Sequence, residues 1–139
     1  MKATKYGYSV KTNLSFDQAV IKATEELKRD GFGILTEIDV KGTMKKKLDL
    51  EFRRYVILGA CNPSLAHRAL SADLTVGLML PCNVVVYENT DGTCTVSALN
   101  PMAAIGVVGN PSLDETAALA TAKLSAVIAK LTRLSAMPA

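Results

Sequence analysis

Residues 52–65, FRRYVILGACNPSL, decide the fold because they carry a β-strand directly into a helix. Residues 52–60 are rich in aromatic and β-branched side chains, which favour a strand. Asn62 is a preferred helix N-cap, and Pro63 suits the first helical position, where its missing N–H is not needed. The sequence therefore predicts a strand over residues 52–60 and a helix from residue 63 to about residue 72.

Further strands are predicted on both sides of this stretch. Residues 5–11 alternate between apolar and polar side chains, which indicates a half-buried strand. Residues 32–38 predict a second strand. Residues 83–88 and 93–99 flank the turn sequence Asn89-Thr90-Asp91-Gly92, and this arrangement predicts a hairpin.

Helices are predicted where apolar residues recur at helical spacing. Ser15 and Gln18 form a capping-box pattern, which satisfies free N–H groups in the first turn of a helix. A short helix is expected over residues 42–50, with Met44 and Leu48 turned inward. Both helices connect predicted strands.

The C-terminal part of the chain predicts a long helix. This helix begins near Pro111 or Ser112, where Ser112 and Glu115 form a second capping box, and its apolar stripe runs to Leu134. The segment before it, residues 101–110, has a looser pattern. Its apolar part, residues 103–109, would either close over a pocket or form a dimer contact.

Strands and helices are mixed along the chain, which predicts a single α+β domain over residues 1–139. The ordered core is expected from about residue 5 to residue 134, followed by a short C-terminal tail. We expect a mainly antiparallel curved sheet with helices packed on one face. If the other face is apolar it needs cover, which a second copy of the chain would supply.

Composition limits the possible functions. Hydrophobic residues make up 49% of the chain and charged residues 21%, as in globular domains. A net charge of +3 with few aromatic residues does not favour nucleic-acid binding. No apolar run reaches the length of a membrane span, and the first ten residues lack the apolar core of a signal peptide. These features predict a cytoplasmic protein with reduced thiols that binds neither nucleic acid nor membrane.

Two Cys-Asn pairs are the candidate site residues. Cys61 and Asn62 lie where a strand passes into a helix, and Cys82 and Asn83 lie where the next long strand begins. If these two strands pair antiparallel, both thiols lie at the same edge of the sheet. Cys61 also precedes a helix N-terminus, where a thiol pKa is often lowered. Alternatively, both thiols are small buried hydrophobic groups.

The remaining candidates carry weaker signals. Cys94 shares strand parity with Val96 and is expected in the core. His67, the one histidine, lies about 7 Å along the helix from its cap, too far to activate Cys61 directly. A metal site of Cys61, Cys82 and His67 has suitable ligand types but lacks the close spacing of strong metal motifs.

The segments FRRYVILGACNPSLAHRAL and GLMLPCNVVVYE resemble the family catalogued as domain-of-unknown-function family 302. The resemblance extends from about Tyr6 to Leu131. It implies a small α+β domain similar to one half of the TATA-box-binding protein, and a homodimer. A shared fold does not imply DNA binding. The family brings no established activity, and it directs attention to the residues on either side of Cys61 and Cys82.

The sequence therefore supports three functional hypotheses. The first is a homodimeric module that binds a small ligand or a metal ion near Cys61 and Cys82. The second is a thiol-dependent redox or sulfur-handling enzyme that uses Cys61. The third is a structural or protein-interaction domain whose cysteines only pack. No complete catalytic motif is present, so a non-enzymatic role is favoured, and the cofactor is unknown.

Overall fold

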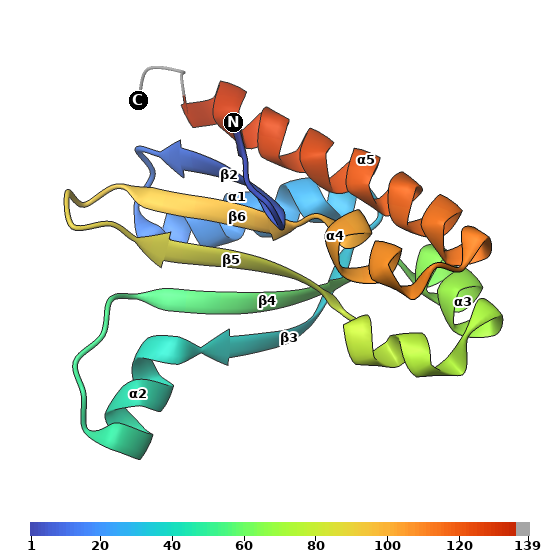
Figure 1. The fold of residues 1–139 in the computed structure, drawn as a ribbon. Helices are drawn as coiled ribbons and strands as arrows, with labels where there is room; N and C mark the ends of the chain where they lie inside the picture. Colours follow the sequence, from blue (N-terminus) through green and yellow to red (C-terminus); the bar gives the residue numbers. More distant parts are fainter. Residues whose placement is uncertain (136–139) are drawn as a thin grey trace.

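A six-stranded antiparallel sheet forms the framework of the molecule, in the order β1-β2-β6-β5-β4-β3 (Figure 1). The strands are β1 (Lys2–Ala3), β2 (Gly7–Thr12), β3 (Gly33–Asp39), β4 (Tyr55–Cys61), β5 (Cys82–Glu88) and β6 (Cys94–Leu99). The structure is a computed structural model and describes residues 1–135, so nearly all of the expected C-terminal tail lies outside it.

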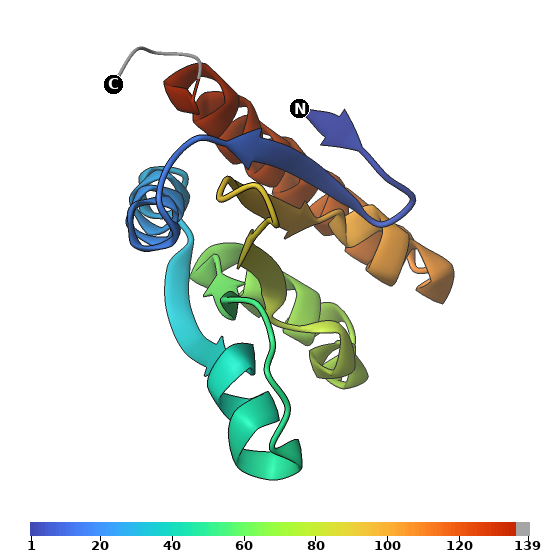
Figure 2. The same ribbon diagram turned by 90° about the vertical axis from the view of Figure 1, so that its left-hand side faces the viewer.

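Except for α2 (Val40–Leu48), the helices pack against one face of this sheet and around one of its ends (Figures 1 and 2). They are α1 (Phe16–Arg29), α3 (Pro63–Ala72), α4 (Pro101–Ile105) and α5 (Pro111–Ser135), with 3₁₀ helices η1 (Leu74–Met79) and η2 (Gly106–Val108). Helices α1 and α5 cover the sheet, and α3, η1 and α4 gather beside the first half of α5. The predicted α+β class is confirmed.

Three helices begin with the dipeptide Asn-Pro. Asn62 accepts a hydrogen bond from the Leu65 N–H and caps α3, as predicted. Asn100 caps α4 and also accepts from the Thr121 hydroxyl at 3.1 Å, which ties α4 to α5. Asn110 accepts from the Ser112 N–H at the start of α5.

The predicted capping box at the start of α5 is therefore wrong. Pro111 already occupies the first helical position, so the cap falls on Asn110 and not on Ser112. By contrast, the predicted box at α1 is confirmed, because Ser15 accepts from the Gln18 N–H and the Gln18 side chain accepts from the Ser15 N–H.

Two further local predictions need correction. The looser segment from residue 101 to residue 110 contains α4 and η2, because Asn100 and Pro101 start a helix there. The short helix α2 begins at Val40 under an Asp39 cap, and it projects beyond the β3 edge of the sheet (Figure 2). None of its residues is buried, and Leu48, which was predicted to face inward, is 61% exposed.

The buried side chains form two separate clusters. The larger cluster lies between the sheet and helices α1 and α5, and contains Leu27, Leu58, Val96 and Leu124 among its fully buried members. The smaller cluster joins α3, η1, α4 and the start of α5, through Ala69, Val76, Ile105, Leu113 and Ala117. Helix α5 contributes to both clusters, so it links the sheet to the helical end of the molecule.

Candidate functional site

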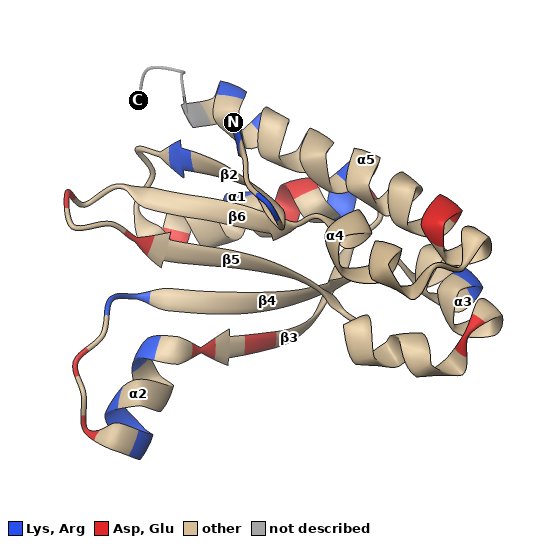
Figure 3. Cartoon of the chain, viewed as in Figure 1, with Lys and Arg blue, Asp and Glu red and all other residues tan. Residues whose placement is uncertain are grey.

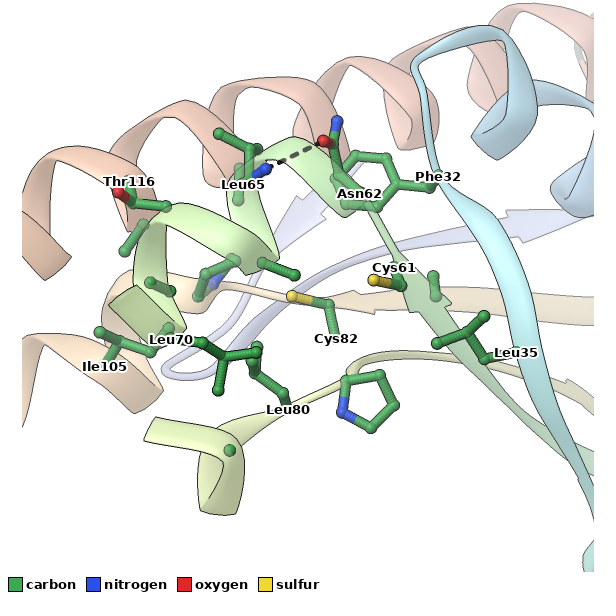
Figure 4. A pocket seen from close by; sticks show the side chains of 18 residues that line it. Phe32, Leu35, Cys61, Asn62, Leu65, Leu70, Leu80, Cys82, Ile105 and Thr116 are labelled. Carbon is green, nitrogen blue, oxygen red and sulfur yellow. Dashed lines mark hydrogen bonds between the residues drawn. The ribbon is translucent and has the colours of Figure 1, made fainter. Parts of the chain in front are cut away.

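A cavity of about 310 Å³ lies where the two hydrophobic clusters meet (Figure 4). The larger cluster contributes Phe32, Ala60 and Cys82 to its lining, and the smaller one contributes Ala69 and Ile105, among others. Alanines dominate the helix surfaces that face it. Their short side chains leave unfilled space between the clusters, which are otherwise closely packed.

Cys61 and Cys82 both line this cavity, as their positions in the sheet allow (Figure 4). Strands β4 and β5 pair antiparallel, with Ala60 opposite Cys82, so the end of one strand meets the start of the other. Cys61 is the last residue of β4 and is half-buried, and Cys82 is buried. The structure thus brings together the two thiols that the sequence placed at one edge of the sheet.

Burial, with a smaller contribution from the neighbouring Cys61, raises the pKa of the Cys82 thiol to about 11. The thiolate is disfavoured because a charged sulfur in an apolar cavity loses its hydration. At neutral pH, Cys82 is therefore a neutral, weakly polar group. This state suits packing against an apolar ligand better than nucleophilic attack.

The two asparagines of the Cys-Asn pairs lie in different places. Asn62 lines the cavity, but its side-chain oxygen is engaged as the cap of α3. Asn83 is exposed, pairs with Gly59 and does not line the cavity. Side chains alternate along β5, so Cys82 faces the helices while Asn83 faces the opposite, open side of the sheet. Asn83 therefore lies apart from Cys61, Asn62 and Cys82.

His67 is also separated from the thiols. Its side chain is exposed on α3 and is not among the residues that line the cavity. Within residues 1–135, no three side chains of His, Cys, Asp or Glu are arranged to hold a metal ion. Cys61, Cys82 and His67 accordingly do not form a metal-binding group in this structure. Cys94 is fully buried in the larger cluster, as expected.

Several residues of the cavity carried no functional signal in the sequence. Leu65 and Ala69 on α3, and Ala117 and Ala120 on α5, have the helical spacing of ordinary core positions. The feature that could have indicated a cavity is the small size of the alanines on two facing helices. Facing alanines leave space between the helices unless another side chain fills it. The sequence does not reveal which helices face each other, so this signal was not recognised.

The remaining polar groups of the lining are already engaged. The Thr116 hydroxyl donates to the Ser112 carbonyl at 3.1 Å, and among residues 1–135 no Asp, Glu, Lys, Arg or His side chain lines the cavity. The arrangement can therefore exclude water and hold apolar atoms. It offers no general base and no charged anchor to a substrate inside the cavity.

Comparisons with known proteins agree with this fold. A family model described as "Domain of unknown function DUF302" matches residues 8–131. The crystal structure of an uncharacterized conserved DUF302 protein from Bacillus stearothermophilus is similar, with a TM-score of 0.84 and 32% sequence identity. The match covers 92% of this chain and 99% of that one. No curated protein matches the chain. Among the described residues, no helix is both long and apolar enough to cross a membrane.

Proposed function

Since the chain belongs to the family described as domain of unknown function DUF302, we propose a function from its own geometry: it binds a small molecule in the cavity beside Cys61 and Cys82. The observation that carries this proposal is the cavity itself, about 310 Å³ of space between two packed clusters. Ligand sites in proteins are commonly apolar clefts of this size or larger.

The surroundings of the thiols favour a small molecule over the other hypotheses. A metal ion would need ligands that do not converge among the described residues. A thiol enzyme that uses Cys61 would need a base beside the sulfur, and none of the described residues that line the cavity is an Asp, Glu, Lys, Arg or His. A purely structural role would leave the cavity unused and predicts that filling it changes nothing except stability.

We predict that Ala66→Phe abolishes ligand binding by filling the cavity. Ala66 is half-buried on α3 and lines the cavity, so a phenyl ring there would occupy the ligand's space. Backbone amide NMR spectra, recorded while a panel of apolar, polar and charged small molecules is added, measure binding at Cys61 and Cys82. The matched control is Ala118→Phe, an exposed alanine on α5 that does not line the cavity. If no compound shifts these amides in the parent, or if Ala66→Phe binds as the parent does, the proposal is wrong.

A second expectation concerns the two thiols. At pH 8, Cys82 should hold about a hundredfold less thiolate than an unperturbed thiol, because its pKa is raised from 9.0 to about 11. Alkylation followed by peptide mass spectrometry should show Cys82 reacting slowly until the pH passes 10. The same raised pKa stabilises the native state below about pH 9, and this contribution is lost as the pH rises towards 11. Rapid labelling of Cys61 at neutral pH would instead support the thiol-enzyme hypothesis.

We further propose that the protein is a homodimer that covers the open face of the sheet. Helices α1 and α5 cover one face, and the other carries Ile57, Val85 and the stacked rings of Tyr55 and Tyr87, whose centroids lie 5.3 Å apart. Next to them on β3, Ile38 pairs with Ile57 and is 48% exposed. These side chains form an apolar patch on the part of the open face made by β3, β4 and β5, and such patches often mark an interface.

The expected result is that Ile57→Lys converts the dimer to a monomer, because a charged side chain in the interface would have to be desolvated. Sedimentation velocity or light scattering measures the mass. Leu119→Lys is the matched control, since Leu119 is 43% exposed on α5, away from the open face. A monomeric parent protein, or an Ile57→Lys protein of unchanged dimeric mass, would show that this face is not the interface.

A further inference from the structure

The cavity offers few polar partners and no charged one to a ligand, among the described residues that line it. Of the residues that the structure describes, eighteen line the cavity, and the polar side chains among these are Asn62, Thr116 and the two thiols. Asn62 and Thr116 already use their oxygens in hydrogen bonds to the backbone of α3 and α5. An ionised ligand group inside the cavity would therefore lose its hydration without a charged partner to compensate for the loss.

Charges are also missing from two of the chain segments around the cavity. No Asp, Glu, Lys or Arg occurs from Leu74 to Tyr87 or from Gly92 to Leu113, segments that contain η1, α4 and η2. Figure 3 shows this end of the molecule without charged residues on η1 and α4. A ligand anchored by a charged head group outside the cavity would find no counter-charge on these segments.

The cavity reaches the surface through apolar residues. Leu35 of β3 and Gly77 of η1 both line it and are both exposed. Leu35 is 68% exposed, and Leu78, the neighbour of Gly77, is 84% exposed. An apolar molecule can therefore contact apolar side chains at the entrance before the cavity encloses it. Part of its apolar surface is removed from water already at this stage.

The volume limits the size of the ligand. An apolar cavity of about 150 Å³ is known to bind benzene, which has six non-hydrogen atoms. By this measure a cavity of about 310 Å³ accommodates roughly ten to twelve such atoms. The thiols are weak hydrogen-bond donors. The ligand can therefore carry one weakly polar group, such as a hydroxyl or a carbonyl, but does not need one in order to bind.

We propose that the ligand is a neutral molecule with a hydrocarbon body and about ten non-hydrogen atoms. This inference rests on the proposed function, that the cavity is a binding site, and adds the chemical class of the ligand. The class excludes nucleotides, sugars, amino acids and short carboxylates, which carry charges or many hydroxyl groups that the lining does not satisfy.

A series of straight-chain alcohols tests the size limit. Affinity, measured by calorimetry or by NMR shifts, should rise about fourfold with each added methylene, the value expected for burying one such group in an apolar site. The rise should stop at a chain of roughly nine to eleven carbons, when the cavity is full. An affinity that keeps rising well beyond this length would overturn the size limit.

A comparison of nonan-1-ol with octanoate tests whether the ligand must be neutral. Both have about ten non-hydrogen atoms, but octanoate is ionised at pH 8, so it should bind at least about tenfold more weakly. Ala66→Phe should remove binding of the alcohol, and Ala66→Leu should shorten the longest chain that adds affinity by about three carbons. Ala118→Phe should change neither result, because Ala118 lies outside the cavity.

The outcomes of these experiments distinguish an error in the proposed ligand class from an error in the proposed binding site. Equal binding of octanoate and nonan-1-ol, with both abolished by Ala66→Phe, would overturn the neutral class while leaving the cavity as a binding site. Binding that Ala66→Phe and Ala66→Leu leave unchanged, or the absence of any binding, would refute the cavity as the site and the ligand class together. Circular dichroism establishes that each variant is folded before it is titrated.

Discussion

Phe32→Ala should lower the free energy of unfolding by about 3–5 kcal/mol, the usual range when a buried phenylalanine is truncated. Phe32 is 2% exposed and belongs to the larger hydrophobic cluster, where it also lines the cavity. Removing its ring would merge new empty space with the existing cavity. Because the neighbouring alanines cannot reach into that space, little of the loss can be recovered by relaxation. Urea unfolding followed by circular dichroism measures the effect.

The matched control is Phe52→Ala. Phe52 is 40% exposed and its ring contacts Tyr55, with centroids 6.2 Å apart, outside the two clusters. The same truncation there should cost about 1 kcal/mol or less, because little buried area is lost. Equal losses at both positions would contradict the burial of Phe32 on which the cavity depends.

Gly59→Val should destabilise the protein by about 3 kcal/mol, at the upper end of the range for overpacking. A Cβ atom built on Gly59 would lie 2.9 Å from Cγ of Pro81 and would overlap the Thr36 hydroxyl. Thr36 lies on the neighbouring strand β3, and Pro81 precedes Cys82 in the lining of the cavity. The absence of a side chain at Gly59 therefore lets the chain before β5 approach β4 closely.

Gly33→Val is the control for this substitution. A Cβ atom at Gly33 meets nothing within 4 Å, although Gly33 lies in the adjacent strand and pairs with Cys61. Valine favours strands, and it reduces the freedom of the unfolded chain, so this change should be neutral or stabilise by up to about 1 kcal/mol. Thermal unfolding of both variants decides the matter, and a destabilisation at Gly33 equal to that at Gly59 would refute the steric explanation.

Local sequence signals predicted the helix starts and the strands that hold the thiols. Asn62 and Pro63 identified the start of α3 because a cap and its first turn depend only on neighbouring residues. The strands around Cys61 and Cys82 were predicted from their composition, and the antiparallel register of β4 with β5 then places Cys61 and Cys82 at one edge. The family resemblance, now supported by the match over residues 8–131, agreed with this arrangement.

The cavity could not be predicted in the same way, because it depends on contacts between distant segments. Its lining combines β3, β4, β5, α3, η1, α4 and α5, and no local pattern shows that these elements meet. Asn83 illustrates the difficulty. Its neighbour in sequence, Cys82, lines the cavity, yet strand alternation turns Asn83 to the other face. Two residues that are adjacent in the sequence therefore need not belong to the same site.

The surface elements were also hard to predict for physical reasons. Helix α2 was expected to bury Leu48, since a helix between two strands usually packs on the sheet. In the structure α2 extends past the edge of β3 and leaves Leu48 exposed. The Lys45 amine instead forms ion pairs with Asp49 and Glu51, at 2.8 and 3.2 Å, so polar contacts near the surface hold this helix.

The division of the interior into two clusters gives the molecule two levels of rigidity. The larger cluster is anchored by a sheet of six strands, whose opening would break many hydrogen bonds at once. The smaller cluster joins the short helices α3, η1 and α4 to the start of α5, so we expect local fluctuations of these short helices to open it at a lower free energy. If the cavity binds a small molecule as we propose, we expect local opening of the helical end to widen its entrance while the strands stay in place.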